Sequence, residues 1–352
     1  MQGVAPARRR ILGTLWGRKG STWKARGWLP PQLDFHGVTP YHPALQKHVP
    51  DPALNLSGSL CALATPFRGE DDALDFDAWT RLIDHQLRGG TRGLVVAGST
   101  GEGAALERDE FIALLEHAVR QVSARVAVLA GTGQSSTRKT IAQTRLAAAA
   151  GADAALVVTP PYVRPTQEGL YRHFQEVAEH GGLPVVLYNV PSRTACDLLP
   201  DTVERLCRHA AIIGIKEAVP DPARMQALLA LRSDHFRILS GDDATCARAI
   251  AAGADGVISV AANLVPAQMQ ALCERAARGD PSVEVLDNDL RPLHDLLGAE
   301  PNPIPLKWCL QRLGMAGPRL RLPLTGLSVS HHARADRVLA NAGLLEPAKA
   351  TG

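Results

Sequence analysis

A lysine ends an apolar stretch of the chain, and its amine is the most reactive candidate group in the sequence. Lys216 directly follows Ile212–Ile215, in a chain that contains 31 arginines and only seven lysines. Since Arg cannot lose its proton and Lys can, a lysine at this place indicates amine chemistry. About one free lysine in 2,500 is neutral at pH 7, and burial increases that fraction. The sequence therefore predicts a Schiff-base nucleophile, with a rim lysine paired to a carboxylate such as Glu217 as the alternative.

Two tyrosines follow other apolar stretches. Tyr188 closes Val185–Tyr188, and Tyr162 comes shortly after Thr159. Phenols beside a carbonyl adduct can pass protons, and a hydroxyl such as that of Thr100 can bridge them. The three side chains are therefore candidates for a proton relay, and the alternative is an aromatic rim whose hydroxyls are already satisfied.

Two further features suit a carboxylate. The glycine-rich turn Gly98–Gly103 carries the hydroxyls of Ser99 and Thr100 beside exposed N–H groups, which favours a carboxylate or a phosphate. A plain tight turn between strand and helix is the alternative. Arg193, just beyond Tyr188, has the planar fork that can bind a substrate carboxylate, although a surface ion pair would use the same side chain.

Histidine and cysteine spacing gives no sign of other chemistry. The 12 histidines include no H-x-x-H or H-E-x-x-H, so we expect no metal site, and no nucleophile elbow supports a Ser-His-Asp triad. The six cysteines lack C-x-x-C spacing, which disfavours a zinc site, a redox pair or a disulfide framework. We expect reduced thiols and a cytoplasmic protein.

Strand-like and helical stretches alternate from residue 59 onward, and they would position these side chains. Eight short apolar stretches are expected to be strands: 60–65, 93–97, 126–130, 155–159, 185–188, 212–216, 237–240 and 256–260. Eight longer stretches with helical spacing follow them in turn: 77–89, 108–123, 137–150, 168–180, 200–209, 221–232, 243–252 and 265–278. Eight such units predict an α/β fold, a (β/α)8 TIM barrel over 57–280, rather than a doubly wound sheet. In that barrel the ends of the strands carry the chemistry.

The two ends of the chain differ from the predicted barrel. Residues 281–347 contain no strand signal and are expected to form a C-terminal domain of three helices, at 282–297, 303–313 and 330–343. Residues 1–56 hold eight Lys or Arg against two acidic residues, a net charge of +6. Their sequence predicts a disordered extension or a start-site artefact, with a targeting segment and a nucleic-acid arm as alternatives. No apolar run approaches the roughly 20 residues of a membrane span, and we expect neither a membrane nor a nucleic-acid partner.

The motifs around these residues resemble the dihydrodipicolinate synthase family (4-hydroxy-tetrahydrodipicolinate synthase) of the pyruvate-dependent class I aldolases, over about residues 58–346. They are 98–102 (GSTGE), 187–194 (LYNVPSRT), 214–218 (GIKEA), 240–243 (SGDD), 256–260 (GVISV) and 300–305 (EPNPIP). The pair of Lys216 and Tyr188 is also similar to that of N-acetylneuraminate and keto-deoxy-sugar lyases.

The resemblance implies that Lys216 forms an imine with pyruvate, whose carboxylate rests on Ser99 and Thr100. The resulting enamine would attack aspartate semialdehyde in the lysine (diaminopimelate) pathway, with no cofactor beyond the imine lysine. Tyr188, Thr100 and Tyr162 match the family's proton relay, with Tyr162 supplied by a neighbouring subunit. The implied assembly is a homotetramer of tight dimers.

Three other positions match substrate-binding residues of the family. Arg193 matches the residue that binds the semialdehyde carboxylate, which favours the synthase over sugar-acid lyases with longer, hydroxylated acceptors. Ile258 matches the residue whose main-chain carbonyl lies near the catalytic amine, and Gly241 lies in the matching SGDD segment. A related keto-deoxy-sugar or N-acetylneuraminate lyase is the near alternative. A silent barrel that serves as a scaffold subunit is the non-enzymatic one.

One departure from the family concerns regulation. The positions that match the pocket of lysine-inhibited members are Gly103, Arg108, Phe111, Ser135, Lys139 and Pro161. A cation at Lys139, where regulated enzymes have a carboxylate, should repel a cationic inhibitor. We therefore expect lysine feedback to be weak or absent.

Overall fold

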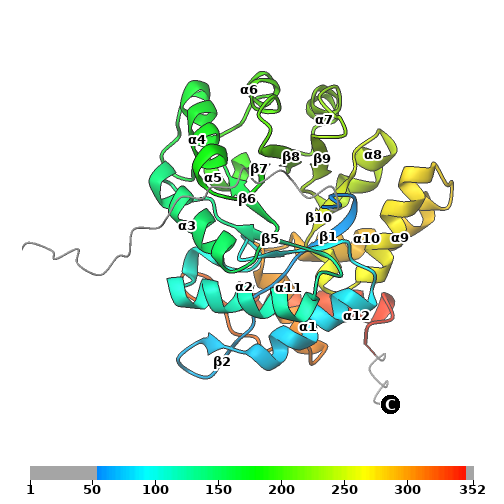
Figure 1. Cartoon of the computed structure of the whole chain (residues 1–352). Coiled ribbons are helices and arrows are strands. Elements are labelled where there is room, and N and C mark those ends of the chain that lie inside the picture. Colours follow the sequence, from blue (N-terminus) through cyan, green and yellow to red (C-terminus); the bar gives the residue numbers. More distant parts are fainter. Residues whose placement is uncertain (1–53, 346–352) are drawn as a thin grey trace, which may run out of the picture. The chain divides into compact units, whose positions relative to one another are not determined.

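The computed structural model describes residues 54–345 of the 352-residue chain. The basic segment predicted over 1–56 lies outside the described residues, apart from its last three. Within them, the strands predicted from residue 59 onward form one closed barrel (Figure 1).

Eight parallel strands make up the barrel, as the sequence predicts. They are β1 (Gly58–Ala62), β4 (Gly93–Val96), β5 (Ala127–Gly131), β6 (Ala154–Val158), β7 (Val185–Asn189), β8 (Ile212–Glu217), β9 (Arg237–Ser240) and β10 (Gly256–Ser259). Each pairs with its neighbour in chain order, and β1 closes the barrel by pairing with both β10 and β4. Their carboxyl ends therefore share one rim, the place where TIM-barrel enzymes carry their sites.

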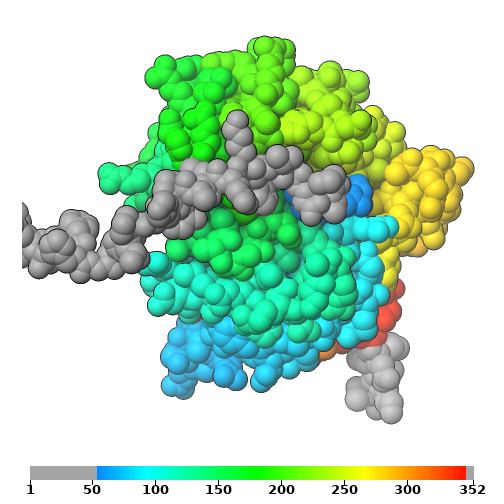
Figure 2. Space-filling model, viewed as in Figure 1, coloured from blue at the N-terminus to red at the C-terminus, as the bar shows by residue number. Residues whose placement is uncertain are grey.

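Helices follow the strands and cover the outside of the barrel (Figure 1). They are α1 (Phe76–Arg88), α2 (Arg108–Val122), α3 (Thr137–Ala149), α4 (Gln167–His180), α6 (Pro200–Leu206), α7 (Pro222–Leu229), α8 (Cys246–Ala251) and α9 (Pro266–Arg278). Helix α1 illustrates why they form: Asp75 caps its first turn by accepting from Ala78, and Trp79, Leu82 and Ile83 are fully buried on one face. In Figure 2 the side chains of α9 (yellow) and of the α4–α6 region (green) lie on different sides of the face shown.

Side chains alternate between two cores along each strand. The inner core fills the barrel with residues such as Leu60, Leu129 and Leu239. The outer core packs strand residues such as Cys61 and Val96 against the helices. The direction of each strand residue therefore decides whether it reaches the interior or the helical layer.

One irregularity in β8 changes that direction. Val185 pairs with Ile212, whereas the next residue, Val186, pairs with Gly214, so one extra residue stands in β8. Strict alternation from the outward-facing Ile212 would turn Lys216 outward as well. The bulge shifts the alternation by one residue, and Lys216 then pairs with the inward-facing Tyr188.

Three helices follow the barrel, also as predicted. They are α10 (Val283–Leu297), α11 (Ile304–Arg312) and α12 (Val329–Asn341). Helix α10 packs against α9, α11 and α12. The division of the chain at residue 280 remains a prediction.

Three short elements, β2, β3 and α5, were not expected from the sequence. Two-residue strands β2 (Phe67–Arg68) and β3 (Ala73–Leu74) pair antiparallel, and the one-turn helix α5 (Pro191–Thr194) follows β7.

Among the helices in 54–345, none is both long and apolar enough to span a membrane.

Candidate active site

The Lys216 side chain lies inside the barrel near its carboxyl rim. It is 5% exposed, and its Nζ stands 4.5 Å from the centroid of the Tyr188 ring. Tyr188 is 7% exposed and occupies the facing position on β7. The structure thus brings together the predicted nucleophile and one member of the predicted relay.

Gly241, just beyond β9, lies against the Lys216 stem. A Cβ at Gly241 would stand 2.9 Å from Cε of Lys216, closer than side chains normally approach. The glycine therefore leaves the volume that the lysine side chain occupies. Ile258, on β10 and 1% exposed, belongs to the inner core that also contains Tyr188.

The turn after β4 places Ser99 and Thr100 at the same rim. Its backbone closes on itself, because the Glu102 N–H donates to the Ser99 oxygen over 3.2 Å and the Gly103 N–H donates to the Gly98 oxygen over 3.1 Å. The Thr100 side chain is 3% exposed. Its hydroxyl accepts a hydrogen bond from Nδ2 of Asn302 over 2.9 Å.

Arg193 lies on the unexpected helix α5. A proline at the first position begins this helix, which turns the chain back at the end of β7. The guanidinium of Arg193 donates to the backbone oxygen of Asn302 over 3.2 Å and is otherwise exposed. Asn302 therefore touches both Thr100 and Arg193.

Tyr162 is different from the other predicted site residues. It lies in the loop after β6 with a φ of 74°, and 91% of the residue is exposed. Its N–H donates to the Thr194 oxygen over 3.4 Å, which ties the loop to α5. Within one chain the phenol points into solvent, so its participation from a neighbouring subunit remains a prediction.

Glu217 is not the partner of Lys216. It faces the outer side of β8, where it accepts from the Val219 N–H over 2.8 Å and from Nδ2 of Asn189. Burial raises the pKa of Glu217 to about 7, against the lowering effect of those hydrogen bonds and of Arg224. The alternative of a rim lysine paired with Glu217 is therefore wrong.

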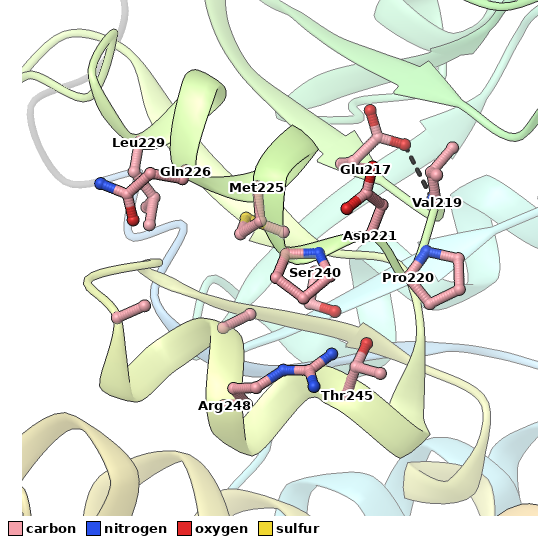
Figure 3. Close-up of a pocket in the computed structure, with 13 residues that line it drawn as sticks. Glu217, Val219, Pro220, Asp221, Met225, Gln226, Leu229, Ser240, Thr245 and Arg248 are labelled. Atoms are coloured by element: carbon pink, nitrogen blue, oxygen red, sulfur yellow. Dashed lines mark hydrogen bonds between the residues drawn. The ribbon is translucent and has the colours of Figure 1, made fainter.

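Glu217 also lines a small cavity on that outer side, between α7 and α8. The cavity has a volume of about 100 Å³, and Met225 and Arg248 contribute to its walls (Figure 3). The Lys216 side chain lies on the other face of the same strand, so this cavity is separate from the barrel interior.

Sequence reasoning missed two residues that contact the turn after β4, Asn302 and Lys307. Lys307, near the start of α11, makes a 2.5 Å ion pair with Glu102, and both side chains are almost fully buried. Burial lowers the pKa of Lys307 to about 8, against the raising effect of Glu102. The EPNPIP segment contained the signal for Asn302, but nothing in the sequence indicated which residues it would meet.

No metal centre emerges from the described residues, since nowhere in 54–345 do three or more His, Cys, Asp or Glu side chains gather as possible ligands. All six cysteines are free.

A barrel with an inward lysine at its carboxyl rim is the arrangement of a class I aldolase, in which a protein amine activates a carbonyl compound. The profile of the Dihydrodipicolinate synthetase family matches residues 55–342. The chain belongs to this family.

Named relatives match more than four-fifths of the chain. The chain is similar to a 4-hydroxy-tetrahydrodipicolinate synthase of Stenotrophomonas maltophilia (strain K279a), with 58% identity over 83% of this chain and 98% of the relative. A synthase of the same name from Xanthomonas axonopodis pv. citri is 59% identical over 83% of this chain and 97% of its own. A chloride-inhibited dihydrodipicolinate synthase from Acinetobacter baumannii, solved with pyruvate, has a TM-score of 0.80 and 40% identity, and the match covers 82% of this chain and 99% of that one.

Proposed function

We propose that this protein condenses pyruvate with L-aspartate 4-semialdehyde to give 4-hydroxy-tetrahydrodipicolinate, a step of lysine biosynthesis. The observation that carries the proposal is the Lys216 amine, buried inside the barrel beside Tyr188. The names of relatives at 58% and 59% identity support the choice of substrates.

The chemistry begins with Lys216. Its neutral amine attacks C2 of pyruvate, and the resulting hydroxyl leaves as water after it takes a proton from the relay of Tyr188, Thr100 and Tyr162. The product is the protonated imine, whose positive nitrogen makes the methyl protons acidic. Removal of one such proton gives the enamine. The enamine carbon then attacks the aldehyde of the second substrate, whose own amine attacks C2, closes the ring and releases Lys216.

Protons move through the relay of Tyr188, Thr100 and Tyr162. The first two are buried at the rim, whereas Tyr162 stands in solvent on a loop of the same chain. A second copy would place its own Tyr162 in the site, so we propose a homodimer as the active unit, and a tetramer as a pair of such dimers. We place the enzyme in the cytoplasm.

Substrate carboxylates meet two groups of donors. The Ser99 and Thr100 hydroxyls and the turn that carries them suit the pyruvate carboxylate, as predicted from the sequence. The exposed Arg193 suits the carboxylate of the semialdehyde. Ile258, through its main-chain carbonyl, and Gly241, through the room it leaves for Lys216, complete the pyruvate side.

The test is the initial rate with both substrates, coupled to a reductase that consumes the product. We expect a robust rate that is lost in Lys216→Ala and kept in Lys139→Ala, which removes an exposed lysine. If the rate is absent while borohydride still traps pyruvate on Lys216, the aldolase chemistry holds and the acceptor is a different aldehyde, such as a sugar.

A further inference from the structure

Asn302, in the C-terminal region, forms hydrogen bonds with two predicted site residues. It lies between α10 and α11, 202 positions after Thr100 in the chain. Its side-chain Nδ2 donates to the Thr100 hydroxyl over 2.9 Å, and its backbone oxygen accepts from Arg193 over 3.2 Å. The side chain and the backbone of Asn302 therefore serve different neighbours.

We propose that Asn302 is a positioning residue that orients the Thr100 hydroxyl for proton transfer, an inference that rests on the pyruvate chemistry proposed above. A hydroxyl has one hydrogen to donate and two lone pairs. The Asn302 amide takes up one lone pair, so the hydroxyl hydrogen must point elsewhere. Held in this way, Thr100 can donate to a neighbour in the relay while its second lone pair remains open to receive a proton.

The two partners are held at a fixed separation by contacts outside the site. On the Thr100 side, the Thr65 hydroxyl donates to the Gly101 oxygen over 2.7 Å. Between the two segments, Lys307 pairs with Glu102 at 2.5 Å, and the Arg321 N–H donates to the same carboxylate over 3.0 Å. These contacts hold the C-terminal region against the turn after β4. They therefore fix the position of Asn302 relative to Thr100.

Among the described residues, the Asn302 side chain makes no hydrogen bond other than the one to Thr100. Its Oδ1 is buried and has no hydrogen-bond partner among the described residues. Replacing the side chain would therefore remove the hydrogen bond to Thr100 and leave the backbone oxygen that Arg193 uses. We expect the loss to fall on kcat and to leave the KM for the semialdehyde within about twofold.

The experiment follows proton transfer without the second substrate. Exchange of the pyruvate methyl protons in D2O, measured by NMR, reports enamine formation, and borohydride trapping reports the imine on Lys216. We expect Asn302→Ala to slow exchange about 10- to 100-fold, since loss of orientation in acid–base catalysis has effects of this order. The extent of trapping should stay at the wild-type level. Asn288→Ala, an exposed asparagine on α10, is the matched control and should exchange like wild type.

Two further variants separate orientation from stability. In Asn302→Asp the carboxylate can only accept, so it should draw the Thr100 hydrogen toward itself, and exchange should recover as pH falls and the acid is protonated. In a Thr100→Val background, Asn302→Ala should add less than about a twofold change, since its target is gone.

These measurements distinguish failure of the role proposed for Asn302 from failure of the proposed function. Exchange at the wild-type rate in Asn302→Ala, or a full additional loss in the Thr100→Val background, overturns the inference while the proposed function stands. Should Asn302→Ala fold poorly, a pH profile of Asn302→Asp parallel to that of wild type overturns it equally. If wild type neither traps pyruvate nor exchanges its methyl protons, the proposed function itself fails and there is no relay to orient.

Discussion

Two of the lysines in residues 54–345 are buried, Lys216 and Lys307, and they differ in their partners. Lys307 lies over the Phe67 ring at 4.1 Å and forms an ion pair with Glu102, whereas Lys216 lies over the Tyr188 ring at 4.5 Å. Among the described residues, no carboxylate lies within ion-pair distance of Lys216. Lys307 is thus committed to a structural contact, while no ion pair has to break before Lys216 can attack a carbonyl carbon. Burial and an aromatic neighbour do not by themselves make a lysine reactive.

Substitution of Lys216 should have the largest effect on activity. We expect Lys216→Arg to lose at least about 1,000-fold in kcat, because Arg keeps the positive charge but cannot form the imine. The coupled rate and borohydride trapping measure this. Lys307→Arg is the control, which should still trap pyruvate. Trapping in Lys216→Arg would mean that another amine is the nucleophile.

Lys307→Met should unfold more easily rather than lose the nucleophile. It leaves the buried Glu102 carboxylate unpaired, which we expect to cost about 3–5 kcal/mol in the free energy of unfolding. Urea titration measures the loss, and the double variant Glu102→Gln with Lys307→Met should recover part of it. A stability within about 0.5 kcal/mol of wild type, the usual range for a surface substitution, would contradict the structural role of Lys307.

Glu217, next to Lys216 in sequence, should affect how the stability of the protein depends on pH. The pKa of Glu217 is about 7 in the folded protein and 4.5 as a free group. The folded state therefore binds this proton more tightly than the unfolded state does. The stability from this group is therefore complete below about pH 4.5 and is lost as pH rises through 7. Relative to Glu217→Gln, the wild type should lose roughly 2–3 kcal/mol between pH 5 and pH 8.

Urea titrations of both proteins at several pH values test this prediction, and subtracting the two curves removes the other carboxylates. Asp197 and Arg224 face the same network and remain in both proteins. Imine trapping should persist in Glu217→Gln, because the carboxylate lies on the opposite face of β8 from Lys216. Loss of trapping would restore Glu217 as a partner of the amine.

A third lysine, Lys139, is exposed on α3 and should show the smallest effect. The positions matching the family's regulatory pocket are partly brought together, since the Ser135 hydroxyl donates to the Pro161 oxygen over 3.0 Å. We expect less than a twofold change in rate with millimolar lysine, because the Lys139 charge opposes a cationic ligand. Strong inhibition at sub-millimolar lysine would refute this.

The order and kind of the elements could be read from the sequence. Apolar stretches such as Val185–Tyr188 and Ile212–Lys216 are short, rich in β-branched residues and separated by helical spacing, and local pattern decides such elements. Their ends agree with the structure to within a few residues. The exceptions are the hairpin of β2 and β3 and the single turn of α5, which are too short to carry a period.

The sequence also located Lys216, Tyr188, Thr100 and Arg193 at strand ends, because parallel strands in a barrel share one rim. It could not decide which way each side chain points. Only the pairing of β7 with β8 revealed the extra residue that turns Lys216 inward, because a bulge depends on the partner strand as much as on its own residues.

Contacts across long stretches of chain were likewise decided by the tertiary structure. Glu102 is a charged residue in a glycine-rich turn and Lys307 a charged residue in a helix, and neither pattern indicates burial. They become a pair only because the C-terminal helices pack against the turn after β4, which also brings Asn302 to Thr100. The sequence by itself determined the barrel and the amine, whereas packing between distant segments decided which side chains surround them.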